Sequence, residues 1–377
     1  MQYRIEAPAR ILFGRGEAKA APELMRGFGR RGLIIHGASP ARAAWALDAL
    51  ADCALLALPI ATEPLLSDLT AALPEARAHR PDWVAAIGGG AALDFGKALA
   101  ALIPAPGEPM DHLEVVGRGL PLRAAPLPFI AIPTTAGTGA EVTKNAVIGI
   151  PDHGRKVSLR DPLMLARLVI IDPALTDHCP QRVTLASGLD AITQVIEPFL
   201  SSKATPYTDA ITRPALVPGL PALMRLMQEE DPQARDIMAH ISLTGGLALA
   251  NGGLGAVHGL AGVIGGRFNA PHGAICGALL GPTLRANTEA CADTKYAPRL
   301  TEVFKALAPA LGCPPEDTPE ALGSWAHQTG LPRLSTFGLT QSQIPDIAAA
   351  SAASSSMKGN PVALAAETLE SILHAAL

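Results

Sequence analysis

The chain has 377 residues, of which 49% are hydrophobic and 17% charged, so it can fill two domain cores and is not expected to be disordered. A net charge of -4 with only 4% aromatic residues makes nucleic acid and membranes unexpected partners. The five cysteines are scattered and form no CxxC pair, which favours reduced thiols and a cytoplasmic location.

The first half alternates short apolar runs with alanine-rich segments. Strands are predicted at 33–35, 54–60, 83–87 and 128–132, and helices at 41–51, at 65–79 and from about Leu93. This rhythm predicts a Rossmann-like parallel sheet covered by helices, with ligands beyond the carboxyl ends of the strands. Helical patterns dominate from about residue 180. We therefore expect an α/β dinucleotide-binding domain over residues 1–178 and an all-α metal and substrate domain over 179–377.

Two turns at the expected ligand edge are rich in glycine or threonine. The first is Gly88-Gly89-Gly90, where consecutive glycines permit positive φ and close approach to a ligand, and the start of the next helix can hold a pyrophosphate. The second is PTTAGTGAE at 133–141, which offers threonine hydroxyls. The plainer alternatives are a tight strand-to-helix turn and a surface loop with capping threonines.

A carboxylate and two histidines form a candidate metal site in the second half. Asp190 and Gln194 are four residues apart in a helical pattern and share a face, and His258 and His272 follow. Such a set suits Fe²⁺ or Zn²⁺, which could polarise a carbonyl oxygen. The structural alternatives are an acid near a helix N-cap for Asp190, a hydrogen-bonded helix residue for His258 and a turn residue for His272.

Both turns, the opening ILFGRGEAKAAPEL and the late Asn360-Pro361 together resemble the iron-containing (group III) alcohol dehydrogenases, whose architecture is similar to that of dehydroquinate synthase. The resemblance implies an NAD(P)-dependent oxidoreductase that transfers hydride between nicotinamide and a small alcohol, aldehyde or ketone, and a homodimer or larger assembly. It also implies a structural role for Lys97 in the turn and a cofactor site formed by Gly88, Gly89, Gly90, Asp94, Thr134, Thr135, Thr138 and Lys156. The serines usual in this family are Ala91 and Ala140 here.

The turn after the first predicted strand bears on the choice between NAD and NADP. It reads His36-Gly37-Ala38-Ser39 and lacks the acidic residue that often binds the adenosine ribose in the resembled family. We expect Gly37 and Ser39 to lie at the ribose, and Ser39 with Arg42 to accept a 2′-phosphate. NADP is therefore expected to bind, and even to be preferred.

The resemblance makes Asp190, His258 and His272 the catalytic metal ligands, with Gln194 as the fourth. The family has histidine in place of Gln194, and a proton-relay histidine in place of Gly262. A glutamine oxygen is a weaker ligand, so the metal is expected to bind weakly or to be absent. The alternative is a metal-independent reductase of an unsaturated or keto acid, similar to maleylacetate reductases, that uses Arg267 or backbone amides to hold the charge of the substrate. Arg267 and Asn269 could face the substrate, but the plainer role of Arg267 is a surface or interdomain salt bridge. A lyase related to dehydroquinate synthase and a non-catalytic nucleotide-binding protein remain further alternatives.

Overall fold

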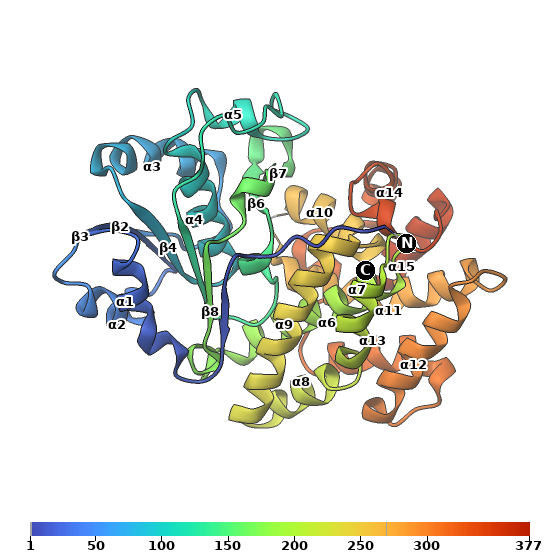
Figure 1. Cartoon of the computed structure of the whole chain (residues 1–377). Helices are drawn as coiled ribbons and strands as arrows, with labels where there is room; N and C mark the ends of the chain where they lie inside the picture. The colour runs from blue at the N-terminus through green and yellow to red at the C-terminus, as the bar shows by residue number, and fades with distance from the viewer. Residues whose placement is uncertain (1, 269) are drawn as a thin grey trace. The chain divides into compact units, whose positions relative to one another are not determined.

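The computed structural model describes residues 2–268 and 270–377 and divides them into two compact units. One unit, Glu6–Asp177, carries every strand of the described residues; the other is helical and consists of His178–Leu377 with the short stretch that ends at Ile5 (Figure 1). The predicted fold class, a parallel α/β unit followed by an all-α unit, is confirmed. The division falls one residue before the boundary expected after residue 178.

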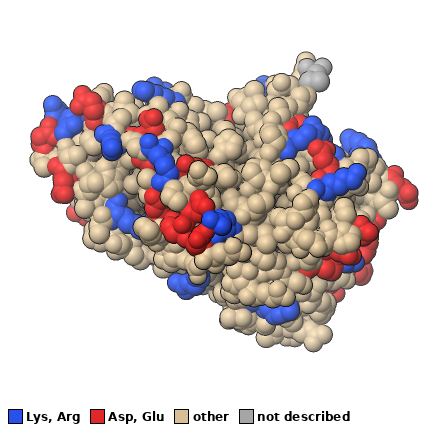
Figure 2. Space-filling model, turned by 90° about the horizontal axis from the view of Figure 1, so that it is seen from below, with Lys and Arg blue, Asp and Glu red and all other residues tan. Residues whose placement is uncertain are grey.

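Charged side chains of both signs lie next to one another in several groups on the face shown in Figure 2. Within the described ranges, no single helix is long and apolar enough to cross a membrane. The helices α9 (Pro232–Gly252) and α10 (Ala256–Phe268) meet that criterion only as a pair, across a bend of 99°. Both contribute buried residues to the helical unit.

A six-stranded parallel sheet forms the centre of the α/β unit. Its strands, in their order across the sheet, are β1 (Ile11–Phe13), β8 (Leu168–Ile171), β5 (Phe129–Pro133), β4 (Trp83–Gly88), β2 (Arg31–His36) and β3 (Ala54–Pro59). All six residues of β4 and all five of β5 are buried. Their continuous apolar sequence is therefore that of central strands covered on both faces.

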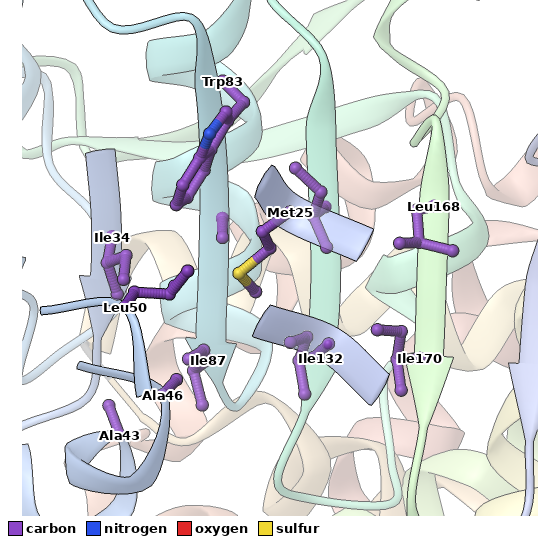
Figure 3. Packing of buried hydrophobic residues seen from close by; sticks show 13 residues of the cluster. Met25, Ile34, Ala43, Ala46, Leu50, Trp83, Ile87, Ile132, Leu168 and Ile170 are labelled. Carbon is purple, nitrogen blue, oxygen red and sulfur yellow. The ribbon is translucent and has the colours of Figure 1, made fainter. Parts of the chain in front are cut away.

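Helices cover the two faces of this sheet. They are α1 (Ala21–Arg26), α2 (Ala44–Ala49), α3 (Leu66–His79) and α4 (Gly90–Leu102), and the short α5 (Pro109–His112) contacts α3. Met25 of α1 and Leu50 after α2 pack with Ile34, Ile87 and Ile132 on one face (Figure 3). The other face receives α4, which approaches so closely that a Cβ on Gly96 would lie 2.9 Å from Ala86 Cβ.

The sequence prediction missed or misplaced several local elements of this unit. An antiparallel pair, β6 (Asn145–Ile150) and β7 (Arg155–Arg160), was not predicted. The helix expected at 41–51 is a 3-10 turn, Pro40–Arg42, followed by the shorter α2. The helix expected from about Leu93 begins at Gly90, because two alanines directly after the glycines favour helix.

A buried lysine fixes the threonine-rich turn to α4, which confirms the supporting role predicted for Lys97. Its Nζ donates to Ala140 O at 2.5 Å, Asn145 O at 2.8 Å and Thr143 Oγ1 at 3.0 Å. Burial lowers the pKa of Lys97 to about 8, against the opposing effect of Asp94 and Glu141. Burial also raises the pKa of Glu141 to about 7. The threonine-rich turn is thus held by the buried, desolvated amino group of Lys97.

We expect Lys97→Met to lower the free energy of unfolding of the α/β unit by about 3 kcal/mol, because buried acceptors would lose their charged donor. Urea unfolding followed by circular dichroism measures the change. Lys19→Met, at an exposed lysine of the same unit, should change it by less than about 0.5 kcal/mol. Equal stability of Lys97→Met and wild type would contradict the role given to this lysine.

The helical unit is built around α6. Its helices are α6 (Gln181–Leu200), α7 (Pro206–Ala215), α8 (Gly219–Gln228), α9, α10, α11 (His272–Ala290), α12 (Ala297–Leu311), α13 (Thr318–Gln328), α14 (Ile344–Ala352) and α15 (Ala366–Ala376). α6 packs against α9 and α11. Glycines allow this: a Cβ on Gly245 of α9 would lie 2.9 Å from Gln194 Cβ, and one on Gly273 of α11 would lie 2.4 Å from Ala186 O.

Candidate functional site

Four side chains converge inside the helical unit. Asp190 comes from the middle of α6, His258 from α10, and His272 and Cys276 from the first turns of α11. Their ligand atoms all lie within 4.8 Å of one another. Asp190 Oδ1 is 3.3 Å from His258 Nε2 and 3.9 Å from His272 Nε2. Cys276 Sγ is 3.5 Å from His272 Nε2 and 3.9 Å from His258 Nε2.

These residues fit a metal ion. Asp190 Oδ1 is buried and accepts no hydrogen bond from the residues that the structure describes, which is costly unless a cation compensates it. Both histidines direct Nε2 to the same place. Imidazole and carboxylate are the donors that Zn²⁺ and Fe²⁺ take. Asp190 and His258 are almost fully buried, whereas the His272 side chain is 31% exposed, so His272 is the most exposed of these three residues.

A buried glutamate orients His258. Glu197, two turns after Asp190 on α6, accepts from His258 Nδ1 at 2.6 Å and from Val257 N at 2.7 Å. With Nδ1 donating to this carboxylate, Nε2 is the nitrogen left to bind a metal, as is usual for metal-binding histidines. Asn360 acts beside it: its Oδ1 accepts from Ala256 N at 3.2 Å. The resembled Asn-Pro element therefore anchors the start of α10.

Charge within the cluster stabilises the ionised form of Asp190. Burial alone would raise its pKa, but His272, His258 and Gln194 lower it to about 2. Burial opposes protonation of the two histidines, yet the neighbouring Cys276 and acidic groups raise the pKa of His258 well above its usual value and that of His272 to about 9. The cluster therefore attracts positive charge.

The structure decides between some of the alternative roles. Asp190 lies in the middle of α6, so the interpretation as an N-cap acid is wrong. His272 is the first residue of α11 rather than part of a turn. Gln194 is buried beside Asp190, and its Oε1 has no hydrogen-bond partner among the described residues. A Cβ on Gly262 would meet no described atom within 4 Å, so the missing relay histidine leaves open space.

The structure does not bring Arg267 to the cluster. It is exposed near the end of α10. It follows His258 by nine residues, which is about 180° round an α-helix, so the hypothesis that it faces the substrate beside the metal ligands is not supported. Asn269, the other predicted contact, lies outside the described residues.

The predicted cofactor turns meet at one edge of the parallel sheet, where β2, β4 and β5 end side by side. An added Cβ on Gly89 would lie 3.1 Å from Thr135 Oγ1, and one on Gly90 would lie 3.0 Å from Thr138 Oγ1. One on Gly88 would lie 3.4 Å from Gly37 N. None of Gly88, Gly89 and Gly90 has positive φ, so that part of the prediction is wrong. Glycine is required here by close approach instead.

Other predicted cofactor residues have partners within the α/β unit. Asp94 Oδ2 accepts from Val147 N at 3.1 Å and so holds β6 against α4. Lys156 Nζ lies 2.5 Å from Glu63 Oε2. Thr134 N donates to Gly88 O at 3.0 Å, which ties the two turns together. Ser39 and Arg42 are exposed after β2.

Sequence reasoning missed two residues of the metal cluster. Cys276 was grouped with four scattered thiols, although it follows His272 by four residues and so shares its helix face. Glu197 follows Asp190 by seven residues, two helical turns, and thus also lies on the same face. Helical spacing was therefore a usable signal in both cases.

Comparison with known proteins gives the family. Residues 8–173 match the sequence profile of iron-containing alcohol dehydrogenases, and residues 184–377 match the C-terminal profile of the same family. The chain belongs to the iron-containing alcohol dehydrogenase family. Members of this family are oxidoreductases that use NAD(P) and a metal.

Individual members of the family resemble the chain at moderate identity. A long-chain-alcohol dehydrogenase 1 of Geobacillus thermodenitrificans is 37% identical over 66% of this chain and 61% of its own length, so the match spans less than two thirds of that relative. A 4-hydroxybutyrate dehydrogenase of Cupriavidus necator is 32% identical over 74% of each chain. The structure of a sulfoacetaldehyde reductase from Bifidobacterium kashiwanohense in complex with NAD⁺ is 25% identical, with a TM-score of 0.85 over 100% of this chain and 99% of that one.

A side chain at Gly90 should keep the start of α4 from lying against Thr138 at the edge of the sheet where the cofactor is expected. We expect Gly90→Val to weaken NADPH binding about 100-fold, roughly 2.7 kcal/mol, because its side chain would collide with Thr138 and cover the amides at the start of α4. Fluorescence titration with NADPH measures the affinity. Gly323→Val, where an added Cβ meets no described atom within 4 Å, is the control. Unchanged affinity in Gly90→Val would rule out this turn as the cofactor site.

Proposed function

We propose that the protein is an NAD(P)-dependent oxidoreductase that transfers hydride between nicotinamide and a small alcohol, aldehyde or ketone, assisted by a divalent metal. The observation that carries the proposal is the convergence of Asp190 Oδ1, His258 Nε2 and His272 Nε2, with the carboxylate oxygen buried and without a hydrogen-bond partner among the described residues. Family membership supports the same reaction class.

The residues of the chain divide this task between two sites. Gly88, Gly89 and Gly90, with Thr134, Thr135 and Thr138, would bind the dinucleotide through backbone amides at the start of α4 and through hydroxyls. Asp190, His258 and His272 would hold the metal, and Glu197 fixes the His258 ring. When bound, the nicotinamide supplies or accepts the hydride and the metal ion polarises the substrate oxygen.

Proton supply differs from that in relatives with a relay histidine. With glycine at position 262 the chain offers no titratable side chain there. The exposed side of His272 gives solvent a route to the cluster, so water would supply the proton for a newly formed alkoxide. Because a positioned acid or base contributes about 10²–10⁴-fold to rate, turnover should be slow where protonation limits it.

The substrate is expected to be a short carbonyl compound or the corresponding alcohol. A relative named 4-hydroxybutyrate dehydrogenase and a structural neighbour named sulfoacetaldehyde reductase both act, by name, on short molecules with a terminal anion. Such substrates therefore belong in the first panel, together with uncharged aldehydes and ketones.

The deciding experiment follows NADPH oxidation over this panel before and after complete metal removal and metal return. We expect activity to disappear with the metal and to return with Zn²⁺ or Fe²⁺. Asp190→Asn should lower kcat/KM by about 10³-fold, beyond the roughly 10–100-fold typical of residues that only support metal ligands. Asp346→Asn, at an exposed carboxylate of the same unit, should not. Activity that survives metal removal would favour the metal-independent reductase, and absence of turnover despite NADPH binding would favour a non-catalytic protein.

We also propose that NADP is accepted and preferred over NAD. The segment from His36 to Arg42 after β2 contains no carboxylate to repel a 2′-phosphate. Ser39 and Arg42 are exposed there. Arg42 already donates to Leu175 O at 3.3 Å through one guanidinium nitrogen, which leaves its other donors for a phosphate.

Ser39→Asp tests this preference. We expect kcat/KM for NADPH to fall at least about 10-fold, because 1.4 kcal/mol of repulsion between the new carboxylate and the 2′-phosphate is enough. The value for NADH should stay within about 2-fold. Ser39→Asn, which is similar in size but uncharged, is the control. Strong selectivity of the wild type for NADH would overturn the proposal.

The two units would then have separate tasks, dinucleotide binding in the α/β unit and metal and substrate binding in the helical unit.

We further propose a homodimer or larger assembly, as the family resemblance implies, and a cytoplasmic location. The five free cysteines, with no disulfide among the described residues, support a reducing compartment.

A further inference from the structure

Cys276 adds a fourth potential ligand to Asp190, His258 and His272. Relatives with the family pattern complete the set with a histidine that is replaced here by Gln194. Cys276 is fully buried, and its Sγ is 3.5 Å from His272 Nε2 and 3.9 Å from His258 Nε2. It is thus a second candidate for the fourth ligand, from a different helix.

Two of the separations between the four donor atoms match those of a tetrahedral site. Bonds of about 2.0 Å to nitrogen or oxygen and about 2.3 Å to sulfur place tetrahedral ligands about 3.3 Å apart, or about 3.5 Å when one is sulfur. The Asp190–His258 and His272–Cys276 separations are 3.3 and 3.5 Å. The Asp190–His272 and His258–Cys276 separations are both 3.9 Å. The remaining two separations lie within 4.8 Å, so the four side chains would move closer together on binding an ion.

Charge also favours the thiol over the amide. A metal-bound cysteine loses its proton, which here would pass to solvent, and becomes an anion. Asp190 and Cys276 together would neutralise a divalent ion inside a buried site, whereas Asp190 with Gln194 would leave one net positive charge without compensation. Gln194 lies one helical turn after Asp190 on α6 and is buried, so it lines the cluster as a neutral neighbour of that carboxylate.

We propose that Cys276 is the fourth protein ligand, as a thiolate, in place of Gln194. The site is then Asp-His-His-Cys rather than the Asp-His-His-His of the family. The soft sulfur donor shifts its selectivity toward Zn²⁺ and away from Fe²⁺. This inference rests on the proposed metal site but not on any particular substrate.

Cobalt binding to the full-length protein tests the ligand directly. Co²⁺ is added to metal-free protein, the bound metal is counted by mass spectrometry, and the near-ultraviolet spectrum is recorded. We expect one Co²⁺ per chain and a sulfur-to-cobalt charge-transfer band. The band should be absent from Cys276→Ala and present in Gln194→Ala. Cys291→Ala, which removes another buried cysteine at the end of α11, should keep it.

A rescue variant separates ligand loss from misfolding. In Cys276→Ala combined with Gln194→His, imidazole replaces sulfur, so we expect stoichiometric Co²⁺ binding to return without the charge-transfer band. Zn²⁺ affinity, measured by chelator competition, should fall more than about 100-fold in Cys276→Ala, beyond the loss typical of a supporting residue. In anaerobic competition the ratio of bound Zn²⁺ to Fe²⁺ should be higher for wild type than for the rescue variant.

The outcomes distinguish this inference from the proposed function. Stoichiometric Co²⁺ binding without the band in wild type, or a band that persists in Cys276→Ala, overturns the thiolate ligand while the metal-dependent reaction stands. If wild type shows the charge-transfer band but reduces no carbonyl compound, Cys276 is supported as a metal ligand and the proposed reaction is overturned. If Cys276→Ala does not fold, the wild-type band and its loss in the rescue variant carry the test. Absence of Co²⁺ and Zn²⁺ binding to wild type overturns both.

Discussion

Glu197 is the group on which the geometry of the metal cluster depends. One of its oxygens holds the backbone of α10 at Val257, and the other holds the ring of His258. A single carboxylate therefore fixes both the position of the helix and the orientation of the ligand that it carries. Because the group is buried, these hydrogen bonds also compensate its desolvation, and the two requirements reinforce one another.

Close packing sets the remaining distances. His272 can reach Asp190 only because α11 lies against α6, with Gly273 directly at the Ala186 carbonyl. The α/β unit uses the same device, where Gly89 and Gly90 bring the start of α4 against the threonines of the next turn. In both units glycine is required because it has no Cβ, which lets the backbone come close to a neighbouring element, and not because of its backbone conformation. Substitution by alanine at these positions would therefore change distances between functional groups.

Sequence patterns were sufficient for the large features of the fold. Continuous apolar strands such as Trp83–Gly88 and long helical patterns such as Gln181–Leu200 are dictated mainly by burial, which the sequence shows directly. The pair β6 and β7 was missed because their sequences, NAVIGI and RKVSLR, are short, and because β6 is held in place by contacts with α3 and α4 and β7 by contacts with β6. Such tertiary contacts are invisible in a local pattern.

The candidate site was predictable in part for the same reason. Asp190, His258 and His272 are recognisable through the family pattern, and their meeting follows from helix packing that no spacing rule supplies. Cys276 was missed because it stands outside that pattern, although its distance of four residues from His272 points to the same helix face. Where a chain lacks one ligand of its family's metal site, a replacement ligand is therefore best sought three, four or seven residues from the ligands that it retains.

The open space at the Cβ position of Gly262 makes this residue a suitable site for substitution. A new side chain there would meet no described atom within 4 Å at its Cβ, and it would project from the same face of α10 as His258, one turn along. Position 262 therefore tolerates a Cβ without steric conflict. Introducing a titratable side chain at position 262 would therefore measure what a proton donor contributes to the rate, in a chain that has none at that position.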